Sequence, residues 1–212
     1  MLSRKTAVRT AAAVGLSAAA FKLFEGRIGA MLIEAVGERQ LKGARLARRT
    51  AQLKGAALTT AHYAERAAAP DTAPSARRDL LVLGGFTTDL PTMVPLVVAF
   101  LRALPRGSAG CWRVLMLEVP MHGRGAVPGC AAEDFPDGGA LEDGALAFMD
   151  ALGLGLPGGA SPPLTVMGYS LGGGGACRLL ARAPGRFDAG VLVAPGFVEV
   201  RRCDGCCRLA GC

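Results

Sequence analysis

The sequence predicts an α/β fold in which a mostly parallel sheet carries helices on both faces. Short apolar runs that lack polar alternation are typical of strands covered on both sides. Such runs alternate along the chain with segments of helical periodicity, which is the order of a parallel α/β sheet. The strand-like runs are 79–83, 111–120, 164–167 and 189–195, and the helix-like segments are 93–104, 141–152 and 176–183.

The composition is typical of a globular domain that is rich in apolar residues and poor in charged ones. The chain has 212 residues, of which 51% are hydrophobic and 19% are charged, enough for one domain with a sizeable core. The net charge is +7, but most of the excess Arg and Lys precedes Leu80. A nucleic-acid reader carries its positive charge on the folded face that makes contact. We therefore expect no nucleic-acid partner.

Residues 1–49 form a basic N-terminal segment that precedes the predicted domain. An acid-free start and an apolar run at 11–21 suit an organelle transit peptide, a signal peptide or a short membrane anchor. The run is shorter than the roughly 20 residues that span a bilayer, which disfavours a full transmembrane helix. Helical apolar spacing continues from Phe21 to Ala35, and this stripe could rest on a membrane surface or pack on the chain's own domain. The expected destination is an organelle, mitochondrion or plastid, or a membrane surface.

Residues 50–200 carry the predicted domain. Its first part, 50–66, is expected to form two short strands around a turn at Gly55, followed by a Pro-containing linker. His62 lies in this hairpin between Ala61 and Tyr63. We interpret it as a half-buried structural histidine.

The stretch from Leu164 to Gly173 contains the candidate site. An apolar, β-branched run ends in Gly168-Tyr169-Ser170-Leu171-Gly172, and a helix-like segment follows directly. A serine in so tight a strand-to-helix turn has a strained backbone, and its flanking positions must lack side chains. The order of strand, Gly-x-Ser-x-Gly and helix is that of a nucleophile elbow, in which the helix start faces developing negative charge.

Two other patterns carry no cofactor or metal prediction. Residues 153–158 match Gly-x-Gly-x-x-Gly, but a helix precedes them and Ser161-Pro162-Pro163 follows, so the strand and helix of a dinucleotide site are missing. Four of the seven cysteines crowd residues 201–212, a Cys-rich tail without strand or helix pattern. Two of them are adjacent and no second spaced pair exists, which is a poor zinc ligand set. We expect neither cofactor nor metal.

Together these motifs resemble the α/β-hydrolase superfamily. Residues 80–86 look like its first loop after a strand, 118–124 look like its Asp-x-Pro-Gly-His-Gly segment, and 168–173 look like its elbow. The resemblance covers about residues 50–197. It is nearest to the monoacylglycerol-lipase and esterase branch, which implies serine hydrolysis of small acyl esters or lipids.

The resemblance implies roles for individual residues. Ser170 would be the nucleophile, and the backbone N–H groups of Phe86 and Leu171 would form the oxyanion hole. His122 matches a structural loop histidine of the family. Two departures stand out, since Gly84 replaces the usual histidine of the first loop and Met121 replaces a glycine of the second.

The rest of the family's catalytic triad is not evident in this chain. The family order is serine, then an acid, then histidine, yet no histidine follows Ser170. Glu199, just past a predicted strand, is the one plausible acid, because Asp188 lies at the entry of that strand. The family's last strands would stand where the tail 201–212 lies. Two hypotheses follow: an ester hydrolase that is incomplete in this chain, or a non-catalytic product of the same fold that binds a ligand or a partner.

Overall fold

A computed structural model describes the backbone in residues 27–54, 59–85, 88–118, 139–196, 199–203 and 206–210. Contacts divide the chain into two compact units, one ending at Gln40 and the other beginning at Leu41. The second unit holds the predicted sheet and the candidate site.

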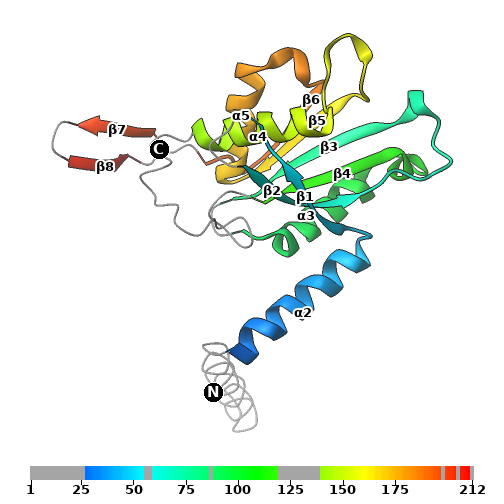
Figure 1. The fold of residues 1–212 in the computed structure, drawn as a ribbon, viewed down its shortest axis with the longest axis horizontal. Coiled ribbons are helices and arrows are strands. Elements are labelled where there is room, and N and C mark those ends of the chain that lie inside the picture. The colour runs from blue at the N-terminus through cyan, green and yellow to red at the C-terminus, as the bar shows by residue number, and fades with distance from the viewer. Residues whose placement is uncertain are drawn as a thin grey trace, which may run out of the picture. The chain divides into compact units, whose positions relative to one another are not determined.

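The core of the second unit is a six-stranded sheet with the order β1-β2-β4-β3-β5-β6 (Figure 1). Its strands are β1 (Ala47–Gln52), β2 (Thr60–Arg66), β3 (Arg78–Leu83), β4 (Trp112–Leu117), β5 (Leu164–Tyr169) and β6 (Ala189–Val193). The hairpin β1–β2 and the pair β2–β4 are antiparallel, whereas β4, β3, β5 and β6 run parallel. The prediction of a mostly parallel α/β sheet, with a hairpin at its start, is confirmed.

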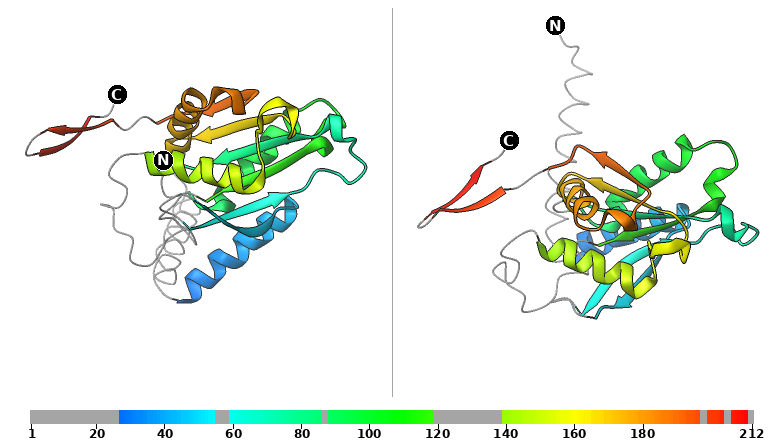
Figure 2. Two further views of the ribbon diagram at one scale, coloured as in Figure 1. Left: turned by 45° about the horizontal axis from the view of Figure 1, so that its top comes forward. Right: turned by 90° about the horizontal axis from the view of Figure 1, so that it is seen from above.

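Helices cover both faces of this sheet, as Figure 2 shows. The helices are α3 (Leu90–Ala103), α4 (Gly139–Leu152) and α5 (Leu171–Arg182). Along β3, Leu80 and Val82 join the core layer that contains α3 residues, and Leu81 and Leu83 join the layer of α4 and α5. All four leucine and valine side chains are fully buried. A strand buried on both sides needs no polar alternation, which explains the continuous apolar runs in the sequence.

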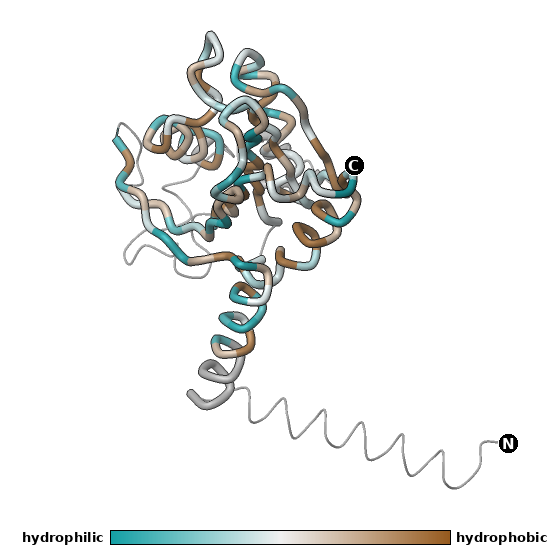
Figure 3. The backbone as a smooth tube through the Cα atoms, turned by 90° about the vertical axis from the view of Figure 1, so that its right-hand side faces the viewer, coloured by the Kyte–Doolittle hydropathy of each residue, from teal (hydrophilic) through white to brown (hydrophobic). Residues whose placement is uncertain are grey.

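Helix α2 (Arg27–Gly43) precedes the sheet. Figure 3 shows both hydrophilic and hydrophobic positions in the coloured part of this helix, whereas most of the expected amphipathic spacing, from Phe21 to Ala35, falls on residues whose side chains the structure does not describe. The earlier part of that spacing, from Phe21, lies outside the described residues. Among the described helices, none combines the length and the apolarity needed to cross a bilayer.

The Cys-rich tail differs from its sequence prediction. Residues 201–212 were expected to lack strands, but β7 (Glu199–Cys203) and β8 (Cys206–Ala210) pair with each other as a separate antiparallel sheet. The residues between the two strands are Asp204 and Gly205, a dipeptide that favours tight hairpins. This local turn signal, rather than apolar alternation, is the sequence feature that predicts the hairpin.

Candidate active site

Ser170 stands between β5 and α5, as the motif requires. Its backbone has φ 53° and ψ −120°, and it caps helix α5 without a side-chain capping bond. The amide N–H of Ser170 donates to the carbonyl of Val193 on the neighbouring strand at 3.0 Å. A non-glycine residue with positive φ is uncommon and costs roughly 1–3 kcal/mol. The strained turn expected from the sequence is therefore present, and the hydroxyl is not used to close the helix.

Two glycines make this turn sterically possible. A Cβ at Gly168 would collide with the backbone carbonyl of Gly172, and a Cβ at Gly172 would collide with the carbonyls of Leu83 and Gly84. Both obstacles are backbone atoms of packed strands and helices, which cannot move aside cheaply. The spacing of Gly168 and Gly172 around Ser170 is thus dictated by close packing of β5, β3 and α5.

The start of α5 presents backbone N–H groups beside Ser170. The Ser170 carbonyl accepts from the N–H groups of Gly173 at 2.9 Å and Gly196 at 2.8 Å. Leu171 is the first helical residue, and the first N–H groups of a helix have no partner within the helix. A Cβ added at Gly196 would lie 3.5 Å from the Leu171 nitrogen, so the missing side chain leaves space next to that N–H.

The loop after β3 passes directly beside the serine. A Cβ at Gly85 would lie 3.0 Å from the Ser170 Cβ and 3.3 Å from the Tyr169 ring. Phe86, the expected second oxyanion donor, lies outside the described residues, as do Met121 and His122. The structure therefore brings together Gly85, Ser170 and the N-terminus of α5.

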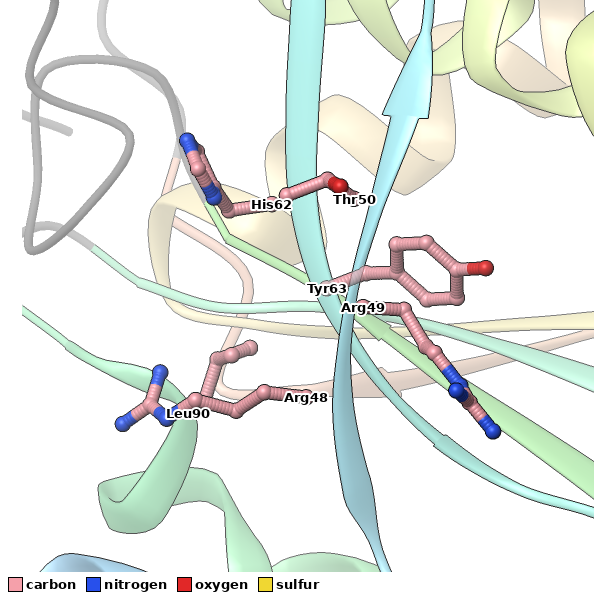
Figure 4. A pocket seen from close by; sticks show the side chains of 6 residues that line it. All are labelled: Arg48, Arg49, Thr50, His62, Tyr63 and Leu90. Carbon is pink, nitrogen blue, oxygen red and sulfur yellow. The ribbon is translucent and has the colours of Figure 1, made fainter.

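His62 lies on β2, opposite Thr50 of β1. It is half-buried, its carbonyl accepts from the Glu118 N–H at 2.9 Å, and it borders a cavity of about 230 Å³. That cavity is lined by Arg48, Arg49, Thr50, His62, Tyr63 and Leu90; Figure 4 shows His62 and Arg48 on one side of the hairpin, and Tyr63 and Arg49 on the other.

The sheet order separates His62 from the serine. Strands β4 and β3 lie between β2 and β5, which is three inter-strand steps, or about 14 Å at ~4.8 Å per step. His62 is therefore not in hydrogen-bond reach of Ser170, in agreement with its interpretation as a structural histidine.

The two acidic candidates, Asp188 and Glu199, lie on different elements of the chain. Asp188 lies just before β6, where its carboxylate accepts from the Leu164 N–H at 2.9 Å and its own N–H donates to the Leu164 carbonyl at 2.9 Å. These bonds tie the amino ends of β5 and β6 together, so Asp188 is structural. Glu199 begins β7, and its side chain lies outside the described part of the chain.

A buried carboxyl also lies at this amino edge. Asp79 of β3 is 2% exposed, and this burial raises its pKa to about 6. The nearby Arg113 guanidinium opposes the increase and the Glu65 carboxylate adds to it. Ser170 lies at the carboxyl end of its strand, so Asp79 does not take part in its chemistry. Among the side chains that the structure describes, no group of three metal-ligating residues occurs.

Sequence reasoning missed the side chains that pack beside Gly84 in the loop after β3. Thr88 and Met93 occupy the space next to Gly84, at 2.5 Å and 2.7 Å from where its Cβ would be. The available signal was the glycine itself, which stands where the resembling family has a histidine.

A mixed, mostly parallel sheet with a strained serine at a strand-to-helix turn defines the class of α/β proteins that carry a nucleophile elbow. The family model described as alpha/beta hydrolase fold matches residues 80–205, more than half of the chain. The chain belongs to this family. No curated protein sequence matches it at a significant level.

Solved structures with the same fold include several hydrolases. A protein assigned as a lipase from Acinetobacter baumannii AYE is 16% identical with a TM-score of 0.58, covering 78% of this chain and 47% of that one. Carboxylesterase CesB from Bacillus subtilis is 18% identical with a TM-score of 0.51, covering 78% and 49%. Epoxide hydrolase VrEH1 from Vigna radiata is 18% identical with a TM-score of 0.54, covering 74% and 42%. The chain thus spans about half the length of these structures, and likeness at this level concerns the fold.

Proposed function

We propose that this chain carries the nucleophile half of a serine hydrolase that acts on carboxylic esters, acylglycerols among them. The observation that carries the proposal is the backbone of Ser170, with φ 53° in a turn that glycine would adopt without strain. Folding alone gives no reason for a side chain there. A hydroxyl at the carboxyl edge of the sheet, beside the start of a helix, is the arrangement that acyl transfer uses.

In the proposed reaction, the Ser170 Oγ attacks the acyl carbonyl carbon and its proton passes to a base. The carbonyl oxygen becomes an oxyanion, which the N–H groups of Leu171 and Phe86 hold. Collapse of the tetrahedral species expels the alcohol, which takes up the proton, and water then hydrolyses the acyl-enzyme by the same route. No described residue is assigned as this base, because His62 is three strands away from Ser170.

Small acyl esters are the proposed substrates on the strength of the lipase and carboxylesterase among the structural neighbours. The basic N-terminal segment is proposed to reach an organelle or a membrane surface, where lipid esters would be available. A membrane-surface role rests on its charge and apolar spacing alone.

A second candidate function is a non-catalytic protein of the same fold that binds a ligand or a partner. The observation in its favour is that both histidines of the chain, His62 and His122, precede Ser170, whereas the family order places the base after the nucleophile. Without an imidazole in reach, a serine hydroxyl is a poor nucleophile.

Labelling with a fluorophosphonate probe separates the two candidates. We expect the purified 212-residue chain to become labelled. Phosphonylation needs an activated serine and an oxyanion site, and the proposed ester hydrolase has both. S170A should abolish the labelling. S108A is the matched control, since the Ser108 hydroxyl donates to the Pro105 carbonyl at 2.6 Å in an exposed turn, and it should label like the wild type.

The result that contradicts an ester hydrolase is an unlabelled wild-type chain that is folded. That outcome would favour the non-catalytic candidate. Labelling that persists in S170A would assign the reactive group to another residue. Release of p-nitrophenol from esters of increasing acyl length would then give the substrate preference of a labelled chain.

A further inference from the structure

We propose that the turn at residues 193–196 holds the backbone of Ser170 in its strained conformation and so positions the candidate nucleophile. This inference rests on the proposed function and extends it to a turn on the neighbouring strand. The turn begins at Val193, the last residue of β6, and ends at Gly196.

The two ends of this turn bond to the same residue. The Val193 carbonyl accepts from the Ser170 N–H at 3.0 Å, and the Gly196 N–H donates to the Ser170 carbonyl at 2.8 Å. Pro195 has no N–H, so Gly196 is the first residue after Ala194 that can donate a backbone hydrogen bond. One short segment therefore holds both backbone polar groups of the serine.

Ser170 needs this support because its conformation is unfavourable. Its φ of 53° and ψ of −120° lie outside the regions that residues with a side chain prefer. Such a conformation persists only where the surrounding structure enforces it. Two hydrogen bonds from a neighbouring strand are contacts of that kind, and they act on the serine from outside its own strand and helix.

Ala194 makes the two bonds possible. It has a φ of 44°, although it is not a glycine and although a residue before proline favours extended backbone with negative φ. Ala194 is exposed, so packing of its methyl group does not explain this conformation. The positive φ turns the chain directly after β6, which lets the Val193 carbonyl and the Gly196 N–H reach one residue.

The bond from Gly196 also orients the proposed oxyanion donor. The Ser170 carbonyl and the Leu171 N–H belong to one planar peptide unit, so holding the carbonyl determines the direction of that N–H. The same carbonyl accepts from the Gly173 N–H of α5 at 2.9 Å. The peptide unit is thus held by the helix and by the turn. A donor that is fixed before the reaction needs no reorganisation when the oxyanion forms.

The turn lies in direct contact with the start of α5. A Cβ at Gly173 would lie 2.8 Å from the Pro195 Cα, so the helix must lack a side chain there for the turn to approach. A Cβ at Gly196 would lie 3.4 Å from the carbonyl carbon of Ser170. A displacement of about 1 Å in a catalytic arrangement can lower rates by up to ~100-fold. Loosening the turn should therefore slow the chemistry at the serine.

The experiment replaces Ala194 with residues that differ in their tolerance for positive φ. Valine is β-branched and rarely adopts it, whereas glycine adopts it freely and asparagine, which is similar to valine in size, adopts it readily. We expect A194V to slow fluorophosphonate labelling of the full chain by roughly tenfold or more, and A194N and A194G to stay within about twofold of the wild type. Thermal melting of each variant checks that it is folded.

Arg45 provides a control for the general cost of valine at positive φ. It is exposed, has a φ of 58° and precedes β1, which is the edge of the sheet opposite β6. R45V should lower the melting temperature as A194V does. Its labelling rate should equal that of the wild type, because Arg45 is remote from the serine.

Hydrogen exchange followed by NMR gives a readout that does not depend on the reaction. The N–H groups of Ser170 and Gly196 make the two bonds between the elbow and the turn. Both should exchange slowly in the wild type, A194N and R45V, and faster in A194V. The N–H of Leu81, on a strand that is buried on both faces, is the internal reference and should exchange equally in all of them.

Each outcome decides the inference. A194V labelling at the wild-type rate would overturn it, as would a slowing in A194N or R45V as large as that in A194V. If the wild type itself does not label, the proposed function fails and the exchange data alone decide. Faster exchange of Ser170 and Gly196 confined to A194V would then support the positioning of the serine, and unchanged exchange would contradict it.

The wild type also decides if A194V does not fold. Slow exchange of the Ser170 and Gly196 N–H groups would support the inference, because the two bonds would then be stable in solution. Exchange of both groups at the rate of an unprotected amide would show that the turn does not hold the serine.

Discussion

Gly172 is one of the residues at which this structure has no room for a side chain. Its missing Cβ faces two backbone carbonyls, those of Leu83 and Gly84. We expect G172A to lower the free energy of unfolding by roughly 2–4 kcal/mol, because the strand or the helix must shift to admit the methyl group. Urea denaturation measures this difference.

Gly185 provides the matched control for that measurement. It lies in a short 3-10 turn, its φ is not positive, and a Cβ there would meet nothing within 4 Å. The free energy of unfolding of G185A should therefore lie within about 0.5 kcal/mol of the wild-type value. Equal stability of G172A and G185A would contradict the packing argument.

The residues of the turn could be predicted from sequence, but their support could not. Gly168, Ser170 and Gly172 are neighbours in the chain, so a fixed spacing reports their steric roles. The contact of Thr88 and Met93 with position 84 joins a loop to a helix. No periodicity or motif indicates which side chains of α3 reach that loop. These contacts could therefore be found only from the three-dimensional structure.

At the scale of the elements, helices α4 and α5 are joined by two parallel ion pairs that differ in burial. Arg178 Nε lies 2.7 Å from Glu142 Oε1, and the Glu142 side chain is 4% exposed. Arg182 Nη1 lies 2.6 Å from Asp143 Oδ1, but both of these side chains are more than half exposed. The same two helices are thus joined by one ion pair with a buried carboxylate and one ion pair that is exposed.

We expect R178A to destabilise the protein by roughly 1–3 kcal/mol, because it leaves a buried carboxylate without its guanidinium. R182A should cost less than ~1 kcal/mol, since exposed pairs are screened by water and salt. Chemical denaturation of both variants tests the difference. A loss in R182A as large as that in R178A would contradict the role of burial.

The elements themselves follow closely from the sequence. The strand predicted at 79–83 is observed as Arg78–Leu83, and the helix predicted at 141–152 is observed as Gly139–Leu152. Apolar runs and helical spacing are local properties, which explains the agreement. The hairpin β7–β8 was missed because its signal is the turn dipeptide at 204–205, not the pattern of its strands.

At the scale of the whole molecule, the buried carboxyl of Asp79 links stability to pH. Its folded pKa of about 6 lies above its ordinary value of 3.8. The folded state therefore holds the proton more tightly, and stability should fall as pH rises from about 4 to 6. A difference of about two pKa units corresponds to roughly 2–3 kcal/mol.

The neutral variant D79N tests this link. We expect D79N to be more stable than the wild type at pH 7.5 and about equally stable at pH 4, as measured by urea denaturation at both values. D71N, which changes an exposed loop carboxyl, should follow the wild type at both. A D79N variant that is less stable than the wild type at pH 7.5 would show that the charged form is favoured in the folded state.

The order of the strands in the sheet could not be predicted from the sequence. Strand β4 lies between β2 and β3 although it follows β3 in the chain, and β5 returns to the other side of β3. Local patterns predict that strands exist and that they are covered, but not which strand each crossover reaches. The distance between His62 and Ser170 depends on that order, so it could not be derived from the residues alone.

The amino and carboxyl ends of the strands carry different kinds of groups. At the amino ends, Asp79 and Asp188 are committed to the folded state, one by burial and the other by its bonds to Leu164. At the carboxyl ends, Gly85 and Ser170 are committed to the candidate chemistry. Because the length of the strands separates these groups, loops at the carboxyl ends can vary without disturbing the carboxylates. Changes in the loops beside Ser170 therefore need not affect the contacts that join the strands at their amino ends.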